Sequence, residues 1–292
     1  MTRLLRLASV VVALSIAADA AAQPATNSPA PPVLDGAANF VYKDTGVDEL
    51  RLWVFNPTDS GAAASRPAIV LFFGGTWTGG SVEQFAAQAR YLRGRGMVAI
   101  VADYRVRDRH KTTPYESMAD ARSALRWVRA HARELNIDAR RIAAGGGAAG
   151  AHAALSAALF DAFDDPGDDQ QVSARPDALV LFNPVVDTSG FEAFGPQWKD
   201  ASPAHHLRQA LPPMAIFQGK ASASSAVVDQ FCRDVTSLGS VCELHEYEGA
   251  GEGFFDRRVR GGRWYLETLL EADRFLTSLG YLAAPVSSDS PE

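Results

Sequence analysis

The sequence has few residues of several kinds, and each scarcity excludes a class of protein. It contains only two cysteines, and no H-x-x-H motif or Cys/His cluster of the kind that binds zinc, so we expect neither a metal nor another cofactor. No stretch reaches the roughly 20 apolar residues that a membrane-spanning helix requires. The sequence has 28 Lys and Arg against 34 Asp and Glu, a formal net charge of −6. This charge does not indicate a nucleic-acid-binding protein.

The N-terminal residues have the pattern of a secretory signal. Arg3 and Arg6 precede a short apolar stretch at residues 7–18, and small residues offer cleavage sites just before Gln23. The alternative, a retained membrane anchor, requires a longer apolar run than this one. The sequence therefore predicts a signal peptide over residues 1–22, export to the periplasm or the medium, and no membrane span once the signal is removed.

The rest of the chain has a globular composition. Of its 292 residues, 47% are hydrophobic and 21% are charged, which is enough apolar material for a core. Two terminal segments rich in Pro, Ala and Ser are predicted to be a flexible leader (23–36) and a disordered tail (284–292). Because no internal repeat or linker divides what lies between them, we expect one domain over residues 37–283.

Strands and helices are predicted to alternate along this domain. Several of the strands are continuous apolar runs, as expected of parallel strands that are buried on both faces. The expected strands are residues 49–55, 68–73, 97–104, 141–145, 178–183, 214–219 and 242–249. The expected helices are residues 81–93, 114–135, 149–160, 226–238 and 263–279. This order predicts an α/β fold with a mostly parallel central sheet and helices on both faces.

The segment RIAAGGGAAGAH (141–152) has the form of a strand that turns sharply into a helix. In the G-x-S-x-G nucleophile elbow, glycines permit a strained turn of this kind, and the serine hydroxyl stands at the helix N-terminus. Residues 146–150 keep that frame but carry Ala148 where the serine belongs. Since a methyl group cannot attack a carbonyl, we expect the covalent route of serine catalysis to be absent.

Five segments in the same order resemble the α/β-hydrolase superfamily, specifically exported esterases and lipases related to the hormone-sensitive-lipase and carbohydrate-esterase branches. They are FFGGTWTGG (72–80), ADYR (102–105), the elbow just described, FQGKAS (217–222) and YEGAGEGFF (247–255). The resemblance covers about residues 48–280. It implies the α/β-hydrolase fold, and a small-molecule ester or an acylated carbohydrate as the partner of the cleft.

The resemblance also places the three positions of the catalytic triad. In the family order of nucleophile, acid and base they are Ala148, Ser222 and Glu252. Serine chemistry needs a hydroxyl, an imidazole that accepts its proton and a carboxylate that orients the imidazole, and none of the three stands at its position. The resemblance thus implies an esterase fold without an intact triad.

The oxyanion loop is a different case, because its N–H groups belong to the backbone. The resemblance implies that Gly75 or Thr76, together with Ala149, still provides an oxyanion hole, which alone can leave a rate enhancement of roughly 10³–10⁴ over water. Trp77 in the same loop is a candidate ligand contact; otherwise it packs the loop. Cys232 and Cys242 are predicted to form a structural disulfide, since export permits oxidation, the alternative being two buried thiols.

Glu252 has two interpretations. In a partly buried cleft it could act as a general base on water. Alternatively it is solvated or paired with Lys220, Arg257 or Arg258, and such an ion pair would plug the cleft. The histidines are expected to be structural at positions 110, 152 and 245, whereas His205 or His206 could stand in for the absent base.

Three functions follow from this pattern. In the first, the chain is a pseudo-hydrolase that binds a ligand or a protein partner. In the second, it is a carboxylic-ester hydrolase with a rearranged centre, in which Glu252 or a nearby histidine activates water. In the third, it is an inactivated variant of a serine esterase. The first is the prediction that we carry forward. The sequence does not determine the oligomeric state.

Overall fold

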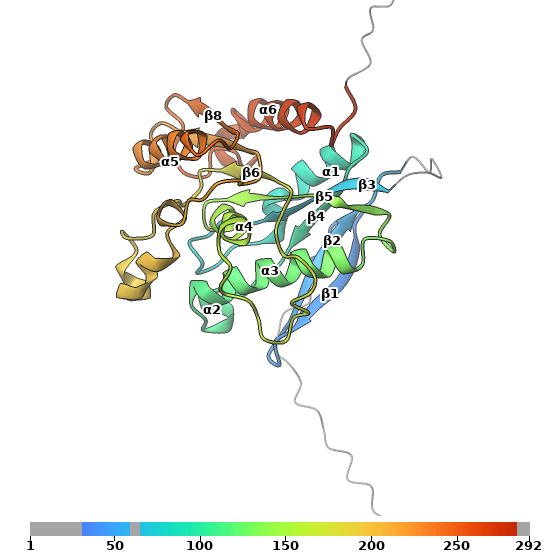
Figure 1. Ribbon diagram of the computed structural model, residues 1–292. Helices are drawn as coiled ribbons and strands as arrows, with labels where there is room; N and C mark the ends of the chain where they lie inside the picture. Colours follow the sequence, from blue (N-terminus) through green and yellow to red (C-terminus); the bar gives the residue numbers. More distant parts are fainter. Residues whose placement is uncertain (1–30, 59–64, 285–292) are drawn as a thin grey trace, which may run out of the picture. The chain divides into compact units, whose positions relative to one another are not determined.

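A computed structural model of the protein describes residues 31–58 and 65–284 (Figure 1). The predicted signal peptide, most of the predicted leader, and the predicted tail beyond residue 284 lie outside these residues. Within them, no helix has the length and the apolar character needed to cross a membrane.

Eight strands form one sheet with the order β1-β2-β4-β3-β5-β6-β7-β8. β1 pairs with β2, and β2 with β4, in antiparallel fashion, and all other neighbours are parallel. The strands are β1 (Ala38–Asp44), β2 (Glu49–Phe55), β3 (Arg66–Phe72), β4 (Val98–Ala102), β5 (Ile137–Gly147), β6 (Ala178–Phe182), β7 (Met214–Gly219) and β8 (Cys242–Tyr247). This mostly parallel sheet confirms the predicted α/β fold.

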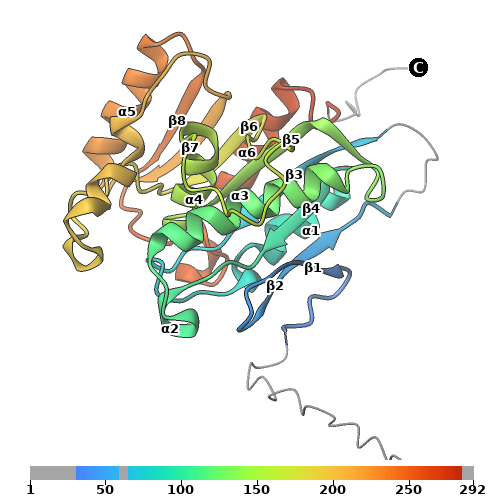
Figure 2. The same ribbon diagram turned by 60° about the horizontal axis from the view of Figure 1, so that its bottom comes forward.

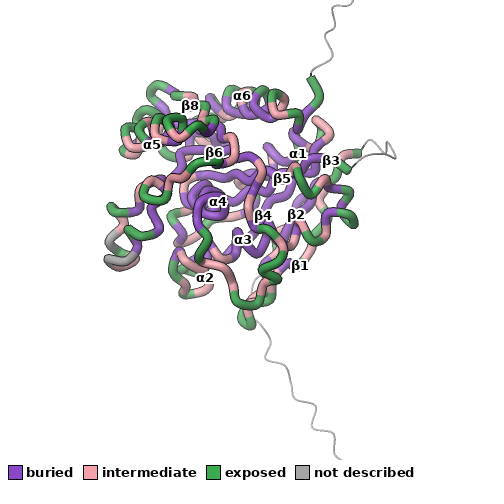
Figure 3. Tube along the Cα trace, viewed as in Figure 1, coloured by how far each residue is buried: buried purple, intermediate pink, exposed green. Residues whose placement is uncertain are grey.

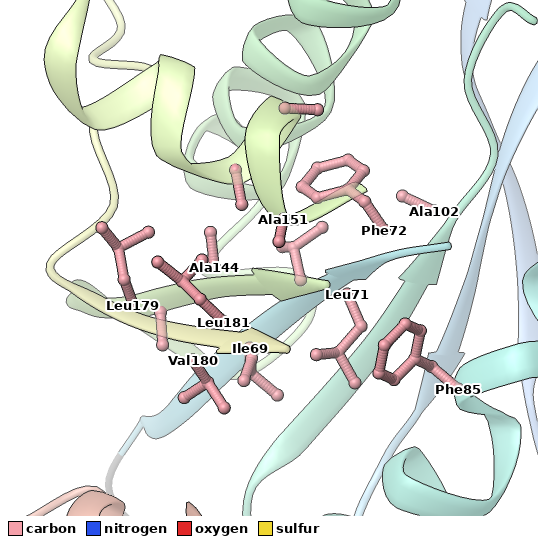
Figure 4. Packing of buried hydrophobic residues seen from close by; sticks show 14 of the residues in the cluster. Ile69, Leu71, Phe72, Phe85, Ala102, Ala144, Ala151, Leu179, Val180 and Leu181 are labelled. Carbon is pink, nitrogen blue, oxygen red and sulfur yellow. The ribbon is translucent and has the colours of Figure 1, made fainter. Parts of the chain in front are cut away.

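Helices cover both faces of the sheet, as the sequence predicts (Figures 1 and 2). α3 (Pro114–Ala130) and α4 (Ala149–Leu159) pack together on one face, and α1 (Ala86–Gly94) and α6 (Tyr265–Ser278) lie on the other. The central strands are buried along their length (Figure 3). Figure 4 shows part of this core, in which apolar side chains of β3, β5 and β6 pack beside Ala151 of α4.

The elements differ from the sequence predictions at several places, among them the short helix α2 (Arg107–His110), which was not predicted, and β5, which begins at Ile137 rather than at residue 141. β1 is an edge strand that the sequence analysis missed, because most of its side chains are exposed and its apolar signal is weak. The helix predicted at 81–93 begins with a short 3₁₀ turn, η1 (Val82–Phe85), before α1. The helix predicted at 114–135 ends at Ala130, because the chain turns back there: Ile137 N–H donates to the Ala132 carbonyl, and Asn136 has a φ of 56°.

The described part of the predicted leader, residues 31–36, packs against the domain. Leu34 is buried, and the indole N–H of Trp53 in β2 donates to the Pro32 carbonyl at 2.8 Å. Arg93 of α1 donates to the Gly36 carbonyl at 3.1 Å. These contacts fix residues 31–36 beside β2 and α1, although their composition is that of a flexible segment.

The two cysteines form a disulfide, as predicted. Cys232 lies in α5 (Ser225–Ser237), Cys242 begins β8, and their Cα atoms are 5.6 Å apart. The bridge therefore fastens α5 to the edge strand of the sheet.

Removal of this bridge by Cys232→Ser together with Cys242→Ser is expected to lower the free energy of unfolding by about 2–3 kcal/mol. The bridge joins residues with a sequence separation of 10, and a loop of about this length constrains the unfolded chain by slightly less than roughly 3 kcal/mol. Urea denaturation of the oxidised protein and the double variant measures the difference. Wild-type protein that has been reduced serves as the control and should resemble the variant; equal midpoints for all three samples would contradict the prediction.

Candidate functional site

A cavity of 660 Å³ lies at the carboxyl ends of the strands. The segments that follow β3, β5, β6, β7 and β8 each contribute to its wall, through Gly75, Ala148, Asn183, Ser224 and Glu252 respectively. Parallel strands bring such segments to one edge of a sheet, which is where α/β folds bind their ligands. This cavity is the candidate functional site.

Ala148 stands at the corner between β5 and α4 and lines the cavity. Its backbone has a φ of 47° and a ψ of −110°, a combination that side-chain-bearing residues rarely adopt. The flanking glycines allow the corner to approach β3 closely: a Cβ on Gly150 would lie 2.2 Å from the Phe72 carbonyl oxygen, and one on Gly146 would lie 2.3 Å from the same atom. The sharp turn predicted from the glycine frame is therefore present, with a methyl group at its apex.

Replacement of Ala148 by Gly is expected to raise the free energy of unfolding by about 1 kcal/mol. A sparsely populated backbone conformation costs of order 1–3 kcal/mol in a residue with a side chain. The greater freedom of Gly in the unfolded chain offsets about 0.4–1 kcal/mol of the relief. Urea denaturation measures the change, and Ala151→Gly in the regular part of α4 is the control, which should lose stability. A loss in both variants would contradict the prediction.

The loop after β3 faces the same cavity. Thr78 N–H and Gly79 N–H both donate to the Gly75 carbonyl, at 3.0 and 3.2 Å, which closes a tight turn. Within that turn Thr76 has a φ of 52° and Trp77 a φ of 57°. The three residues predicted as oxyanion-hole donors, Gly75, Thr76 and Ala149, all line the cavity. The structure thus brings together two segments that are about 70 residues apart in the sequence.

Trp77 packs the loop and also lines the cavity. Its ring is buried in a cluster of aromatic side chains, and all of its neighbours meet it edge-on at ring-centroid distances between 5.2 and 5.7 Å: His152, Phe191, Phe194 and Trp198. Both roles proposed for Trp77 from the sequence are therefore compatible with its position.

Ser222 and Glu252 are in direct contact. The hydroxyl of Ser222 donates to Oε1 of Glu252 and lies 2.9 Å from the hydroxyl of Ser224. The amide of Asn183 donates to Oε2 of Glu252 at 3.2 Å. Glu252 and Ser224 line the cavity, whereas Ser222 is buried behind them and is not part of the wall.

Asn183 was missed by the sequence analysis. It directly follows β6, and besides its bond to Glu252 its side-chain oxygen accepts a hydrogen bond from Gly219 N–H at 2.8 Å. It thereby joins the end of β7 to the segment after β8. The signal that could have found it is an Asn at the end of a buried apolar strand, in the sequence ALVLFN.

Of the alternatives left open for Glu252, the ion pair with a basic residue is not present among the described residues, and Glu252 is exposed. Lys220, just after β7, pairs at 2.9 Å with Glu246 of the neighbouring strand β8. Arg258 pairs with Asp256 at 2.8 Å. In the part of the chain that the structure describes, Glu252 has no cationic partner within 4.0 Å, so no ion pair plugs the cavity.

None of the described histidines lines the cavity. His152 is fully buried in α4, and its Nε2 lies 2.9 Å from the Ala201 carbonyl. Desolvation lowers the pKa of His152 to about 4, so the ring is neutral, in agreement with the structural role expected of it. His206 is bound to the Asp200 carbonyl at 2.7 Å, and His245 stacks on Phe217. Among residues 31–58 and 65–284, no group of three His, Cys, Asp or Glu side chains is placed to hold a metal ion.

Comparison with known proteins gives the same family from sequence and from structure. The family model BD-FAE matches residues 54–197. Esterase LipC of Mycobacterium tuberculosis is 27% identical over 221 residues, which make up 65% of this chain and 54% of LipC. The probable carboxylic ester hydrolase LipM of the same organism is 28% identical over 191 residues, or 57% of this chain and 44% of LipM. The chain thus spans about half the length of these curated relatives.

Solved structures match over the whole domain. The apo form of Thermogutta terrifontis esterase 2 superposes with a TM-score of 0.83 at 40% sequence identity, covering 88% of this chain and 100% of that chain. The same esterase phosphorylated by paraoxon matches with a TM-score of 0.83 at 42% identity. The chain belongs to the α/β-hydrolase superfamily, within the esterase/lipase group that resembles hormone-sensitive lipase.

Proposed function

We propose that this member of the esterase family is a pseudo-hydrolase, which keeps the esterase cleft as a binding site for a small molecule and does not form an acyl-enzyme. The observation that carries the proposal is the position of Ala148. Its methyl group occupies the strained strand-to-helix corner at the wall of the cavity, where the family places its serine. Without a nucleophile at that point, no covalent intermediate can form.

The contact between Ser222 and Glu252 supports the same proposal. These residues stand at the acid and base positions that the family resemblance implies, and the bond between their side chains has the place of the family's bond between carboxylate and imidazole. Ser222 does not line the cavity, so its hydroxyl has no access to a bound ester. The Ser222 hydroxyl is thus bound to Glu252 and lies outside the cavity wall, whereas the Glu252 carboxylate lines it.

A second candidate function rests on Glu252 itself. Its carboxylate lines the cavity and is held by Ser222 and Asn183, which is an arrangement that could orient a general base toward water. In that case the protein would be a slow carboxylic-ester hydrolase without a covalent intermediate. The two candidates differ in what happens when Glu252 loses its charge.

The test is hydrolysis of a short-chain p-nitrophenyl ester by the wild type and by Glu252→Gln, with Thermogutta terrifontis esterase 2 as the active control. We expect both proteins to be far less active than the control. The wild type and Glu252→Gln should have the same residual rate, because an oxyanion hole alone supplies roughly 10³–10⁴ over water. A wild-type rate of about a tenth of the control, lost in Glu252→Gln, would overturn the pseudo-hydrolase and establish the second candidate.

The size and wall of the cavity support small-molecule binding. A volume of 660 Å³ lies within the range of about 300–1,000 Å³ that ligand pockets occupy. Val185, Val186, Val227, Phe191 and Phe255 give the wall an apolar character. Thermogutta terrifontis esterase 2 has been solved with propionate and with butyrate bound, and by analogy we place the apolar arm of the ligand in this cavity.

We further propose that the protein acts outside the cytoplasm, in the periplasm or the medium. The disulfide between Cys232 and Cys242 supports this placement, because such bridges persist in oxidising compartments. The basic and apolar pattern of residues 1–22 supports it as well. Cell fractionation with N-terminal sequencing of the purified protein tests it: recovery in the cytoplasm with residues 1–22 intact would contradict export.

A further inference from the structure

The wall of the cavity carries negative charge and no positive charge. Two carboxylates line it, those of Asp187 and Glu252, and none of the lining residues is Lys, Arg or His. In the described part of the chain neither carboxylate forms an ion pair within 4.0 Å. The cavity therefore has two acidic groups without a counter-ion from the protein.

Neutral groups hold both carboxylates in place. Glu252 accepts hydrogen bonds from Ser222 and Asn183, as described above. Asp187 accepts from the Ser189 N–H at 2.8 Å and from the Ser202 hydroxyl at 3.2 Å. Burial raises the pKa of Asp187, but these hydrogen bonds, with a smaller contribution from the charge of nearby His205, outweigh burial and bring the pKa below its ordinary value, so the group is ionised at neutral pH.

We propose that the ligand of this cavity is an organic cation with an apolar arm, an alkyl- or arylammonium compound. Glu252 is exposed and Asp187 is half-buried, so both carboxylates face solvent in the concave wall, where a carboxylate without a counter-ion attracts a cation and repels an anion. The ammonium group would lie against Glu252 or Asp187, and the apolar arm against Val185, Val227 and Phe255. The inference rests on the proposed binding function and adds to it the charge of the ligand.

The substitution at the base position accounts for this charge. A histidine at position 252 would be neutral or positive near neutral pH, whereas Glu252 adds a negative charge to a wall that already contains Asp187. The cavity thereby differs in sign from one suited to a carboxylic acid. The side chain that replaces the esterase base therefore also contributes, together with Asp187, to the selectivity for a cation.

The experiment compares three ligands of equal chain length: hexylammonium, hexanol and hexanoate. Nile red, a neutral fluorescent dye, reports occupancy of the cavity in the full-length protein, and each ligand competes with it. We expect hexylammonium to bind about tenfold or more tightly than hexanoate, with hexanol between them, and the ratio to decrease as salt is added. Glu252→Gln and Asp187→Asn should each reduce the ratio, and the double variant should remove it.

The matched control is Glu246→Gln, which removes a surface carboxylate that is paired with Lys220 and lies outside the cavity wall. Its ratio should equal that of the wild type. Hexanoate binding as tightly as hexylammonium would overturn the charge selectivity and leave the binding function intact. Failure of Nile red and all three ligands to bind a protein that melts cooperatively would overturn the binding function itself. Circular dichroism of each variant verifies folding. If Asp187→Asn unfolds, the change in the binding ratio of Glu252→Gln alone tests the charge selectivity.

Discussion

Simultaneous restoration of Ala148→Ser, Ser222→Asp and Glu252→His is expected to raise kcat/KM for a short-chain p-nitrophenyl ester by about 10³-fold or more. Triad residues act as a unit, and their joint removal from a serine hydrolase costs on the order of 10⁶-fold in kcat. Two features that the triad needs around it are present: the strained corner at position 148 and the tight turn after β3. Steady-state hydrolysis measures the gain.

The contact between the side chains at positions 222 and 252 supports this prediction. The side chains at 222 and 252 already touch, so an aspartate and a histidine at these positions can form the bond that orients the imidazole. The double variant Ser222→Asp with Glu252→His, which keeps Ala148, is the matched control and should stay inactive because it lacks a nucleophile. A triple variant that folds yet hydrolyses no faster than this control would show that position 148 is not the nucleophile position, and the proposed function would lose its main support.

Acidification from about pH 6.5 to pH 4 is expected to reduce the free energy of unfolding through His152, by about 3 kcal/mol at pH 4. The pKa of this buried ring is lowered by desolvation to about 4, below the value near 6.5 that it has in the unfolded chain. Between these two pH values the unfolded state binds a proton that the folded state excludes. The stability contribution is therefore complete above pH 6.5 and is lost as the pH falls.

His152→Gln isolates this effect. Glutamine can keep a donor to the Ala201 carbonyl but does not titrate, so the variant should lose less stability over the same pH interval. Urea denaturation of both proteins at about pH 7, 5.5 and 4 gives the difference, in which the titration of carboxylates common to both proteins cancels. Parallel stability curves would contradict a neutral, buried His152.

Most of the fold follows from patterns within single segments. The buried apolar runs at 68–73, 178–183 and 214–219 correspond to β3, β6 and β7 because parallel strands covered on both faces need apolar side chains throughout. The boundary of α3 was less predictable. Residues 131–135 continue an acceptable helical sequence, but the chain turns back through Asn136 so that Ile137 can pair with Arg66 of β3.

The site could be predicted only in part. The glycine frame of residues 146–150 and the segment at 247–255 identified Ala148 and Glu252, which line the cavity, and the segment at 217–222 identified Ser222, which contacts Glu252 from behind the wall. The sequence left open whether Glu252 is solvated or paired, and the pair is absent from the described residues because Lys220 is bound to Glu246 and Arg258 to Asp256. Asn183 and Asp187 were not identified, since a single polar residue after a strand has no signature until neighbouring strands place others beside it.

The sequence by itself determined the alternation of strands and helices, the glycine-lined corner and the methyl side chain at position 148, because each depends on backbone preferences and side-chain chemistry within a short segment. Only the tertiary structure decided which groups hold Glu252, that Ser222 is shielded from the cavity, and that two carboxylates share its wall without a cation. Those properties depend on distances between loops that follow different strands, and the register of the sheet sets such distances.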